Sequence, residues 1–155
     1  MPAQEPKLRV RALRHLARRE YTRQELARVL APHAENEAEV DAVLDEFSQR
    51  GWLSETRAAE QLVHARRGRY GPMRIRRDLE AKGVSAEVIG STVASLKEGE
   101  LEAARVVWQK KFREPAGNAA ERAKQARFLL GRGFSSEVIT KLLRSIGRGE
   151  TGDES

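Results

Sequence analysis

The sequence predicts an all-α protein of three tandem three-helix repeats, helix-turn-helix-like and set in an elongated, curved arrangement. Residues 83–89 read Gly-Val-Ser-Ala-Glu-Val-Ile and residues 133–139 read Gly-Phe-Ser-Ser-Glu-Val-Ile, so five of seven positions are identical fifty residues apart. Apolar residues recur around both segments at spacings of four and three, which is one face of a helix. Strand-like alternation is absent, and the residues are 34% charged and 5% aromatic. A recurrence at this period indicates repeats.

The first repeat is expected over residues 7–53, after a flexible N-terminus at residues 1–6. Thr22 and Glu25 have capping-box spacing, which predicts the start of a short second helix. Asn36 is a plausible N-cap for the third helix. The first helix is predicted from the apolar positions Val10, Leu13, Leu16 and Ala17.

The second repeat is expected over residues 54–99. Pro is favoured at the first helical position, so the Gly71-Pro72 step predicts the start of the middle helix. The start of that helix is expected to offer unpaired backbone amides and a positive dipole to anions. Gly83 is predicted to end the helix, and Ser85 to cap the next one.

The third repeat is expected over residues 100–147, followed by a disordered tail at residues 148–155. Gly133 and Ser135 again supply a stop and a start. Both tryptophans, Trp52 and Trp108, are expected to anchor cores. The first helix of this repeat is predicted from one apolar face, namely Leu101, Ala104, Val107, Trp108 and Phe112.

The amino-acid composition excludes several classes of functional site. The chain has no cysteine, which excludes disulfides and thiolate chemistry. No apolar run approaches the ~20 residues of a membrane span. A cytoplasmic protein is therefore expected. The three histidines are scattered, and no catalytic constellation, metal site or cofactor motif is found, so no enzyme activity is expected. The net charge is +6, although residues 35–46 hold six acids and no base. This acidic segment is either a solvated face or a contact for a basic partner.

A dense arginine segment, residues 64–79, is the strongest local signal for binding. The planar guanidinium suits phosphate and carboxylate recognition. A solvated face with internal ion pairs to Asp78 and Glu80 is the structural alternative. Tyr70, which aligns with Tyr21, is expected mainly to pack on the core, with stacking on a nucleic-acid base as its alternative role. The predicted partner-binding residues are Arg66, Arg67, Arg69, Tyr70, Arg74, Arg76 and Arg77.

A second basic set lies in the third repeat. Either a contact footprint or a solvated face would explain it, and the sequence does not separate these interpretations. Its members are Lys110, Lys111, Arg113, Lys124, Arg127 and Arg132.

Five segments together resemble the RecX family, regulators of the RecA recombinase. The resemblance covers about residues 8–147. The third repeat departs from the pattern at Ala120, where the counterpart of Tyr70 is missing. The segments are residues 16–26 (Leu-Ala-Arg-Arg-Glu-Tyr-Thr-Arg-Gln-Glu-Leu), 51–57 (Gly-Trp-Leu-Ser-Glu-Thr-Arg), 69–79 (Arg-Tyr-Gly-Pro-Met-Arg-Ile-Arg-Arg-Asp-Leu), 82–85 (Lys-Gly-Val-Ser) and 124–134 (Lys-Gln-Ala-Arg-Phe-Leu-Leu-Gly-Arg-Gly-Phe).

The resemblance implies a non-catalytic modulator of the RecA–DNA filament that restrains filament extension, strand exchange, ATP hydrolysis and coprotease activity in DNA repair and the SOS response. It implies RecA as partner, with single- or double-stranded DNA as a weaker or filament-dependent partner. A monomer without a membrane partner is expected. Two alternatives stay open: direct DNA binding by helix-turn-helix-like units, and metal-dependent DNA cleavage by the acidic segment.

Overall fold

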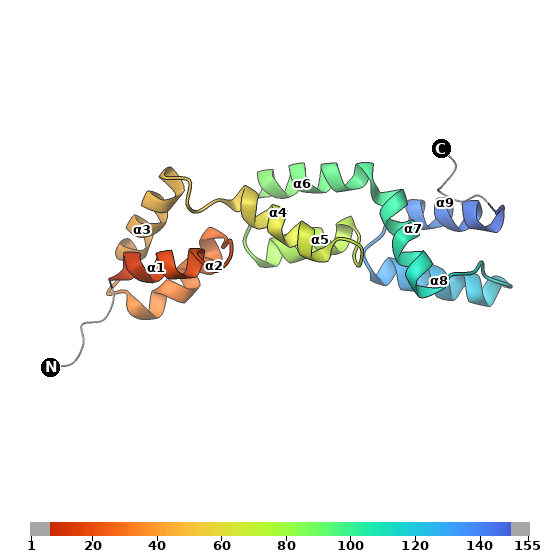
Figure 1. The fold of residues 1–155 in the computed structure, drawn as a ribbon, viewed down its shortest axis with the longest axis horizontal. Helices are drawn as coiled ribbons and strands as arrows, with labels where there is room; N and C mark the ends of the chain where they lie inside the picture. Colours follow the sequence, from red (N-terminus) through yellow and green to blue (C-terminus); the bar gives the residue numbers. More distant parts are fainter. Residues whose placement is uncertain (1–6, 150–155) are drawn as a thin grey trace. The chain divides into compact units, whose positions relative to one another are not determined.

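The computed structural model describes residues 7–149, and these residues form only helices, turns and loops, with no strand (Figure 1). The all-α class and the three helix triplets are thereby confirmed. The predicted flexible residues 1–6, and residues 150–155 of the predicted tail, lie outside the described residues. The helices are α1 (Leu8–Leu16), α2 (Arg23–Leu30) with a short 3-10 helix η1 (Ala31–His33), α3 (Glu37–Gln49), α4 (Glu55–Arg66), α5 (Pro72–Ala81), α6 (Ala86–Glu98), α7 (Glu100–Lys111), α8 (Ala119–Gly131) and α9 (Ser136–Gly147).

Local sequence signals account for where these helices begin. The Thr22 hydroxyl accepts a hydrogen bond from the Glu25 amide at 3.1 Å, and the Thr22 amide donates to the Glu25 carboxylate at 3.0 Å. This is the predicted capping box, and it satisfies two donors that the first turn of α2 leaves free. Asn36 and Ser135 cap α3 and α9 in the same way through their side-chain oxygens.

The chain divides into two compact units. Unit 1 comprises Met1–Gln61 and Leu79–Ile89, and unit 2 comprises Leu62–Asp78 and Gly90–Ser155. Their boundaries fall inside α4, α5 and α6, so the repeat limits 7–53, 54–99 and 100–147 stay a prediction.

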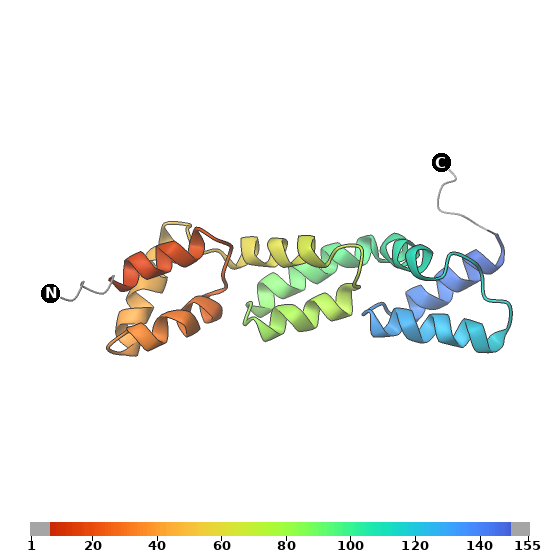
Figure 2. The ribbon, with the colours of Figure 1, turned by 60° about the horizontal axis from the view of Figure 1, so that its bottom comes forward.

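In each unit a helix triplet encloses an apolar core. In unit 1, α1, α2 and α3 contact one another, and in unit 2, α7, α8 and α9 do so (Figure 2). The first core contains Leu8, Ala12, Tyr21, Leu26, Leu30, Val40, Leu44, Phe47 and Leu53. The second contains Ala104, Val107, Trp108, Leu129, Phe134, Ile139, Leu142, Leu143 and Ile146.

Three apolar predictions in unit 1 are wrong. Ala17 is exposed and follows the last residue of α1. Val10 is 39% exposed, because the buried face of α1 runs through Leu8 and Ala12 instead. Trp52 is also 39% exposed and lies in the turn after α3, where the Arg50 guanidinium covers its ring at 4.9 Å. Trp108, by contrast, is buried at 4% exposure, as predicted.

At each repeated Gly-x-Ser segment, a glutamate carboxylate accepts a hydrogen bond from the serine amide at the start of the next helix. Gly83 and Gly133 have φ values of +76° and +96°, in the left-handed region that glycine tolerates best. The amide of Ser135 donates to the Glu100 carboxylate at 2.8 Å in unit 2. In unit 1, the amide of Ser85 donates to Glu55 at the same distance. The segments are thus structural, as the helix-stop and helix-start interpretation predicted.

A polar joint ties the start of α2 to the end of α5 within unit 1. The buried Thr22 hydroxyl donates to the Lys82 carbonyl at 2.5 Å, and the Lys82 ammonium lies 3.5 Å from the Glu25 carboxylate. Burial alone would raise the pKa of Glu25. The hydrogen bond from Thr22 and the charges of Lys82 and Arg19 outweigh burial and hold that pKa below its ordinary value.

Candidate partner-binding surface

The equivalent joint in unit 2 fixes the start of α5 against the turn between α8 and α9. The amide of Gly71 donates to the Arg132 carbonyl at 2.7 Å, and the amide of Met73 donates to the Gly133 carbonyl at 3.0 Å. A Cβ on Gly71 would lie 2.6 Å from the Gly133 carbonyl oxygen, so the two backbones approach as only glycine permits. The joint places side chains of α5 beside those of α8.

This joint corrects the prediction that the start of α5 offers unpaired amides to an anion. Pro72 has no N–H, and the Met73 amide already has the Gly133 carbonyl as acceptor. Gly71 and Pro72 are both buried. The side chains of this region are therefore better candidates for anion recognition than the first amides of α5.

The side chains gather around one tyrosine. The guanidinium carbons of Arg74 and Arg132 lie 4.8 Å and 5.2 Å from the centroid of the Tyr70 ring. Those of Arg66 and Arg69 lie 5.8 Å and 5.9 Å from it. All four are within the ~6 Å at which a cation is attracted to an aromatic face. We call these five residues the Tyr70 cluster, and it joins members of both predicted basic sets.

Part of the cluster is held by an internal carboxylate. The Nε atoms of Arg66 and Arg74 lie 3.2 Å and 3.4 Å from the two oxygens of Asp78. The structural alternative predicted from the sequence is therefore present at Asp78. The two arginine side chains still remain 34% and 40% exposed. Exposed ion pairs of this kind contribute about 0–1 kcal/mol, so they orient the guanidinium groups without occupying them fully.

A second aromatic ring, that of Phe128 on α8, extends the cluster. The Arg132 guanidinium lies 5.0 Å from this ring, and the Lys111 ammonium lies 5.3 Å from it. Phe112 packs against its edge at a centroid distance of 5.4 Å. Arg132 thus lies against both Tyr70 and Phe128, and links the two rings into one aromatic and cationic surface.

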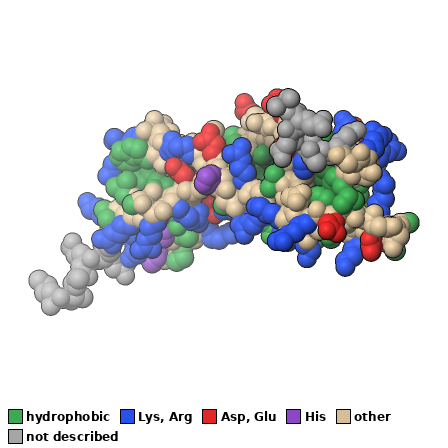
Figure 3. Space-filling model, turned by 45° about the vertical axis from the view of Figure 1, so that its right-hand side comes forward, with side chains coloured by type: hydrophobic (Ala, Val, Ile, Leu, Met, Phe, Trp, Pro, Cys, Tyr) green, Lys and Arg blue, Asp and Glu red, His purple; other side chains and the backbone are tan. Residues whose placement is uncertain are grey.

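The other predicted residues are all exposed. Lys110 lies near Gly68, because a Cβ built there would be 3.6 Å from the Lys110 ammonium. In Figure 3, Lys and Arg side chains, in blue, lie over much of the face shown. The predicted residues that are exposed and outside the Tyr70 cluster are Arg67, Arg76, Arg77, Lys110, Lys111, Arg113, Lys124 and Arg127.

The sequence predicted mainly core packing for Tyr70, and it gave no binding role to Phe128. Tyr21 is buried at 8% exposure and packs in the core of unit 1. Tyr70 is only half-buried, and arginines surround it. The equivalence of the two tyrosines therefore holds for their positions and fails for their environments. The basic residues of α8 around Phe128 were the signal that could have identified it.

Other kinds of site find less support among the described residues. Over residues 7–149, no group of three or more His, Asp or Glu residues could hold a metal ion. Acids of residues 35–46 form ion pairs inside unit 1, where Asp45 pairs with Arg23, and Glu46 with Arg9 and Arg50. No helix over the same residues is long and apolar enough to cross a bilayer.

Comparisons with protein families match all three helix triplets. Family models described as the first, second and third three-helix domains of RecX match residues 9–47, 54–92 and 98–143. The chain is 48% identical to the regulatory protein RecX of Leptothrix cholodnii over 137 residues, which cover 88% of this chain and 87% of the relative. It is 44% identical to the regulatory protein RecX of Ralstonia pickettii over 143 residues, which cover 92% and 90%.

Comparisons with solved structures match the fold. A crystal structure of RecX from Lactobacillus salivarius superposes with a TM-score of 0.80 at 18% identity, over 92% of this chain and 96% of that one. A crystal structure of a regulatory protein RecX superposes with a TM-score of 0.75 at 23% identity, over 88% and 70%. At identities below 25%, this similarity shows the fold and does not identify the residues that contact a partner.

Proposed function

The chain belongs to the RecX family, and on that premise we propose that it binds a RecA–DNA filament and restrains its activity. The restrained activities are filament extension, strand exchange, ATP hydrolysis and coprotease function, in the regulation of DNA repair and the SOS response. Binding without catalysis is part of the proposal. The observation that supports it best is the Tyr70 cluster, where two helix triplets contribute arginines to one aromatic surface.

The chemistry of the cluster fits such a partner. A nucleoprotein filament presents protein carboxylates and DNA phosphates together, and a guanidinium recognises both groups with paired N–H donors. Arg and Tyr are also the residue types that most often dominate protein interfaces. Because Asp78 and Tyr70 already orient Arg66 and Arg74, less side-chain entropy is lost on binding.

Direct reading of DNA bases by helix-turn-helix-like units has less support. In such units the start of the second helix contacts base edges. Here the helices that follow the Gly-x-Ser turns are α6 and α9, and their first turns carry Glu87 and Glu137 and no arginine or lysine. The exposed arginines that remain suit phosphates and carboxylates better than a set of base-specific contacts.

Inhibition of RecA ATPase by the double variant Arg74→Ala/Arg132→Ala tests the proposal. A loss of ~1.4 kcal/mol in binding is a tenfold change, and central interface arginines commonly exceed it, so we expect at least about a tenfold rise in the half-inhibitory concentration. The matched control Arg14→Ala/Arg18→Ala removes two exposed arginines from unit 1 and should leave inhibition unchanged.

Two results would contradict the proposal. Undiminished inhibition by a folded Arg74→Ala/Arg132→Ala protein would remove the Tyr70 cluster from the mechanism. A wild-type chain that fails to bind filaments, yet binds bare duplex with sequence preference, would favour direct DNA binding instead.

A further inference from the structure

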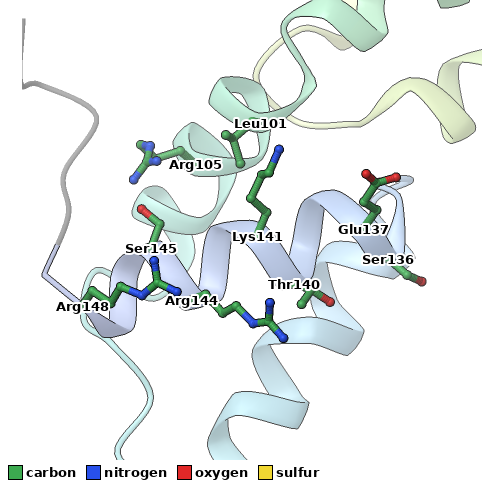
Figure 4. A pocket seen from close by; sticks show the side chains of 9 residues that line it. All are labelled: Leu101, Arg105, Ser136, Glu137, Thr140, Lys141, Arg144, Ser145 and Arg148. Atoms are coloured by element: carbon green, nitrogen blue, oxygen red, sulfur yellow. The ribbon is translucent and has the colours of Figure 1, made fainter.

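A groove between α7 and α9, on the opposite side of α9 from its buried residues, is not part of the Tyr70 cluster. It has a volume of about 670 Å³ and is lined by Leu101 and Arg105 of α7 together with the outer face of α9 (Figure 4). The opposite face of α9 carries Ile139, Leu142 and Ile146 and is buried in the core of unit 2. The groove is therefore a solvent-facing feature of one compact unit.

Its outer face is a row of cations. Lys141, Arg144 and the C-cap Arg148 follow one another at intervals of three and four residues, so they lie on one side of α9 about 4.5 Å and 6 Å apart along its axis. Figure 4 shows Lys141 extending from α9 toward Leu101, with Arg144 and Arg148 further along the helix. A linear row of positive charges fits a linear polyanion better than a compact anion.

Two of these cations, Lys141 and Arg144, are available for a ligand. Within residues 7–149, Lys141 and Arg144 form no ion pair, and both are exposed. On the α7 side, the buried Nε of Arg105 has no hydrogen-bond acceptor within the same described range, although a Glu102 oxygen lies 3.4 Å away. Among the lining residues that the structure describes, Glu137 is the only acid, and it lies in the first turn of α9.

The other lining groups favour phosphate over carboxylate chemistry. Thr140 and Ser145 add hydroxyl groups to the same lining, and Arg, Lys, Ser and Thr side chains are among the usual protein contacts to nucleic-acid phosphates. None of the described lining residues is aromatic, so they offer no platform on which a base could stack. The lining residues therefore suit the phosphate backbone of a nucleic acid and do not favour recognition of its base sequence.

We propose that this groove binds the phosphodiester backbone of a nucleic-acid strand without sequence preference. The inference does not depend on a RecA partner, because a bare strand suffices to test it. It assigns strand contact to α7 and α9, and leaves the Tyr70 cluster as a separate surface for the filament.

The test is fluorescence anisotropy with an oligo-dT strand of about 20 nucleotides, longer than the ~4–16 nucleotides of common single-strand sites. The variant Lys141→Ala/Arg144→Ala removes the two unpaired cations, and Arg28→Ala/Lys97→Ala is a control with the same change in charge at exposed positions elsewhere. Each phosphate contact on a single strand contributes ~0.7 to the slope of log affinity against log salt, so the slope should become shallower by about 1.4. At 0.1 M salt the affinity should fall roughly 25-fold, whereas the control should match the wild type.

Three outcomes would overturn the inference. The first is unchanged strand affinity in a helical Lys141→Ala/Arg144→Ala protein. The second is equal loss in the control variant, which would indicate net charge alone. The third is competition by poly-glutamate as strong as competition by unlabelled strand, which would indicate an acidic polypeptide as ligand. The Arg74→Ala/Arg132→Ala protein should keep its strand affinity, so a failure here is distinguishable from a failure of the filament proposal.

Discussion

At the scale of single residues, Gly133 has the most constrained backbone of the unit 2 joint. Its φ is +96°, and a Cβ would lie 2.5 Å from the Cβ of Arg74 and 2.6 Å from its amide nitrogen. A side chain would therefore be strained by the backbone conformation and would also collide with α5. Neither conflict can be relieved by a rotamer change, because the atoms involved belong to or adjoin the main chain.

The first prediction is that Gly133→Ala lowers the free energy of unfolding by about 1–3 kcal/mol or more. Gly131, two residues earlier, ends α8 with open space where a Cβ would lie. Gly131→Ala should therefore be neutral or stabilise by up to about 1 kcal/mol. Thermal unfolding followed by circular dichroism compares the two, and equal Tm values for both variants would contradict the proposed role of the joint.

The same residues show what the sequence could and could not predict. The stop at Gly133 and the cap at Ser135 depend on neighbours within a few positions, so local spacing predicted them correctly. The environment of Tyr70 depends on Arg132, which is distant in sequence and arrives through backbone hydrogen bonds to Gly71 and Met73. No local pattern encodes that contact, and the alignment of Tyr70 with Tyr21 favoured the wrong environment.

At the scale of helices, a buried glutamate couples the first and third helices of a triplet. Glu100 begins α7 with only 5% exposure, and its carboxylate accepts from the Ser135 amide at the start of α9. The first amides of a helix have no acceptor within the helix, and a carboxylate there also interacts favourably with the helix dipole. The hydrogen bond thus sets where α9 begins relative to α7.

The second prediction is that Glu100→Ala destabilises unit 2 by about 1.5–3 kcal/mol, the range for a hydrogen bond to a charged group. Glu98→Ala removes the same charge two residues earlier, at the exposed end of α6, and should cost little. Amide hydrogen exchange across the first turn of α9 measures the local effect. Unchanged protection there in Glu100→Ala would show that the Glu100 carboxylate does not hold the start of α9.

Helix faces were easier to predict than the surfaces that helices build together. The apolar face of α7 was identified correctly because its spacing is regular, and Ala104, Val107 and Trp108 are buried. The first helix was misread at Val10 because α1 is short and its buried face rests on Leu8 and Ala12. The row of cations on α9 was present in the sequence at helical spacing, yet its significance depends on Arg105 of α7 completing a groove.

At the scale of the whole molecule, the net charge of +6 raises the question of whether binding follows local surfaces or total charge. A cationic protein is attracted to any nucleoprotein filament, but charges separated by more than the Debye length of ~10 Å at 0.1 M salt are largely screened. Contacts made at the interface itself persist, and each one that neutralises a phosphate adds to the salt dependence. If total charge drives binding, variants of equal net charge should bind equally. If contacts at particular surfaces drive it, variants of equal net charge should differ in affinity and in salt dependence.

The third prediction is that filament binding weakens between about 50 and 200 mM salt, with a slope set by particular residues. Lys141→Ala/Arg144→Ala and Arg74→Ala/Arg132→Ala should each reduce the slope, and a variant with all four substitutions should reduce it by the sum, because independent sites add. Arg14→Ala/Arg18→Ala has the same net charge as either double variant and should keep the wild-type slope. Binding of labelled protein to preassembled RecA filaments measures all of these slopes. Equal slopes at equal net charge would assign the attraction to the molecule as a whole and would remove both surfaces from its specificity.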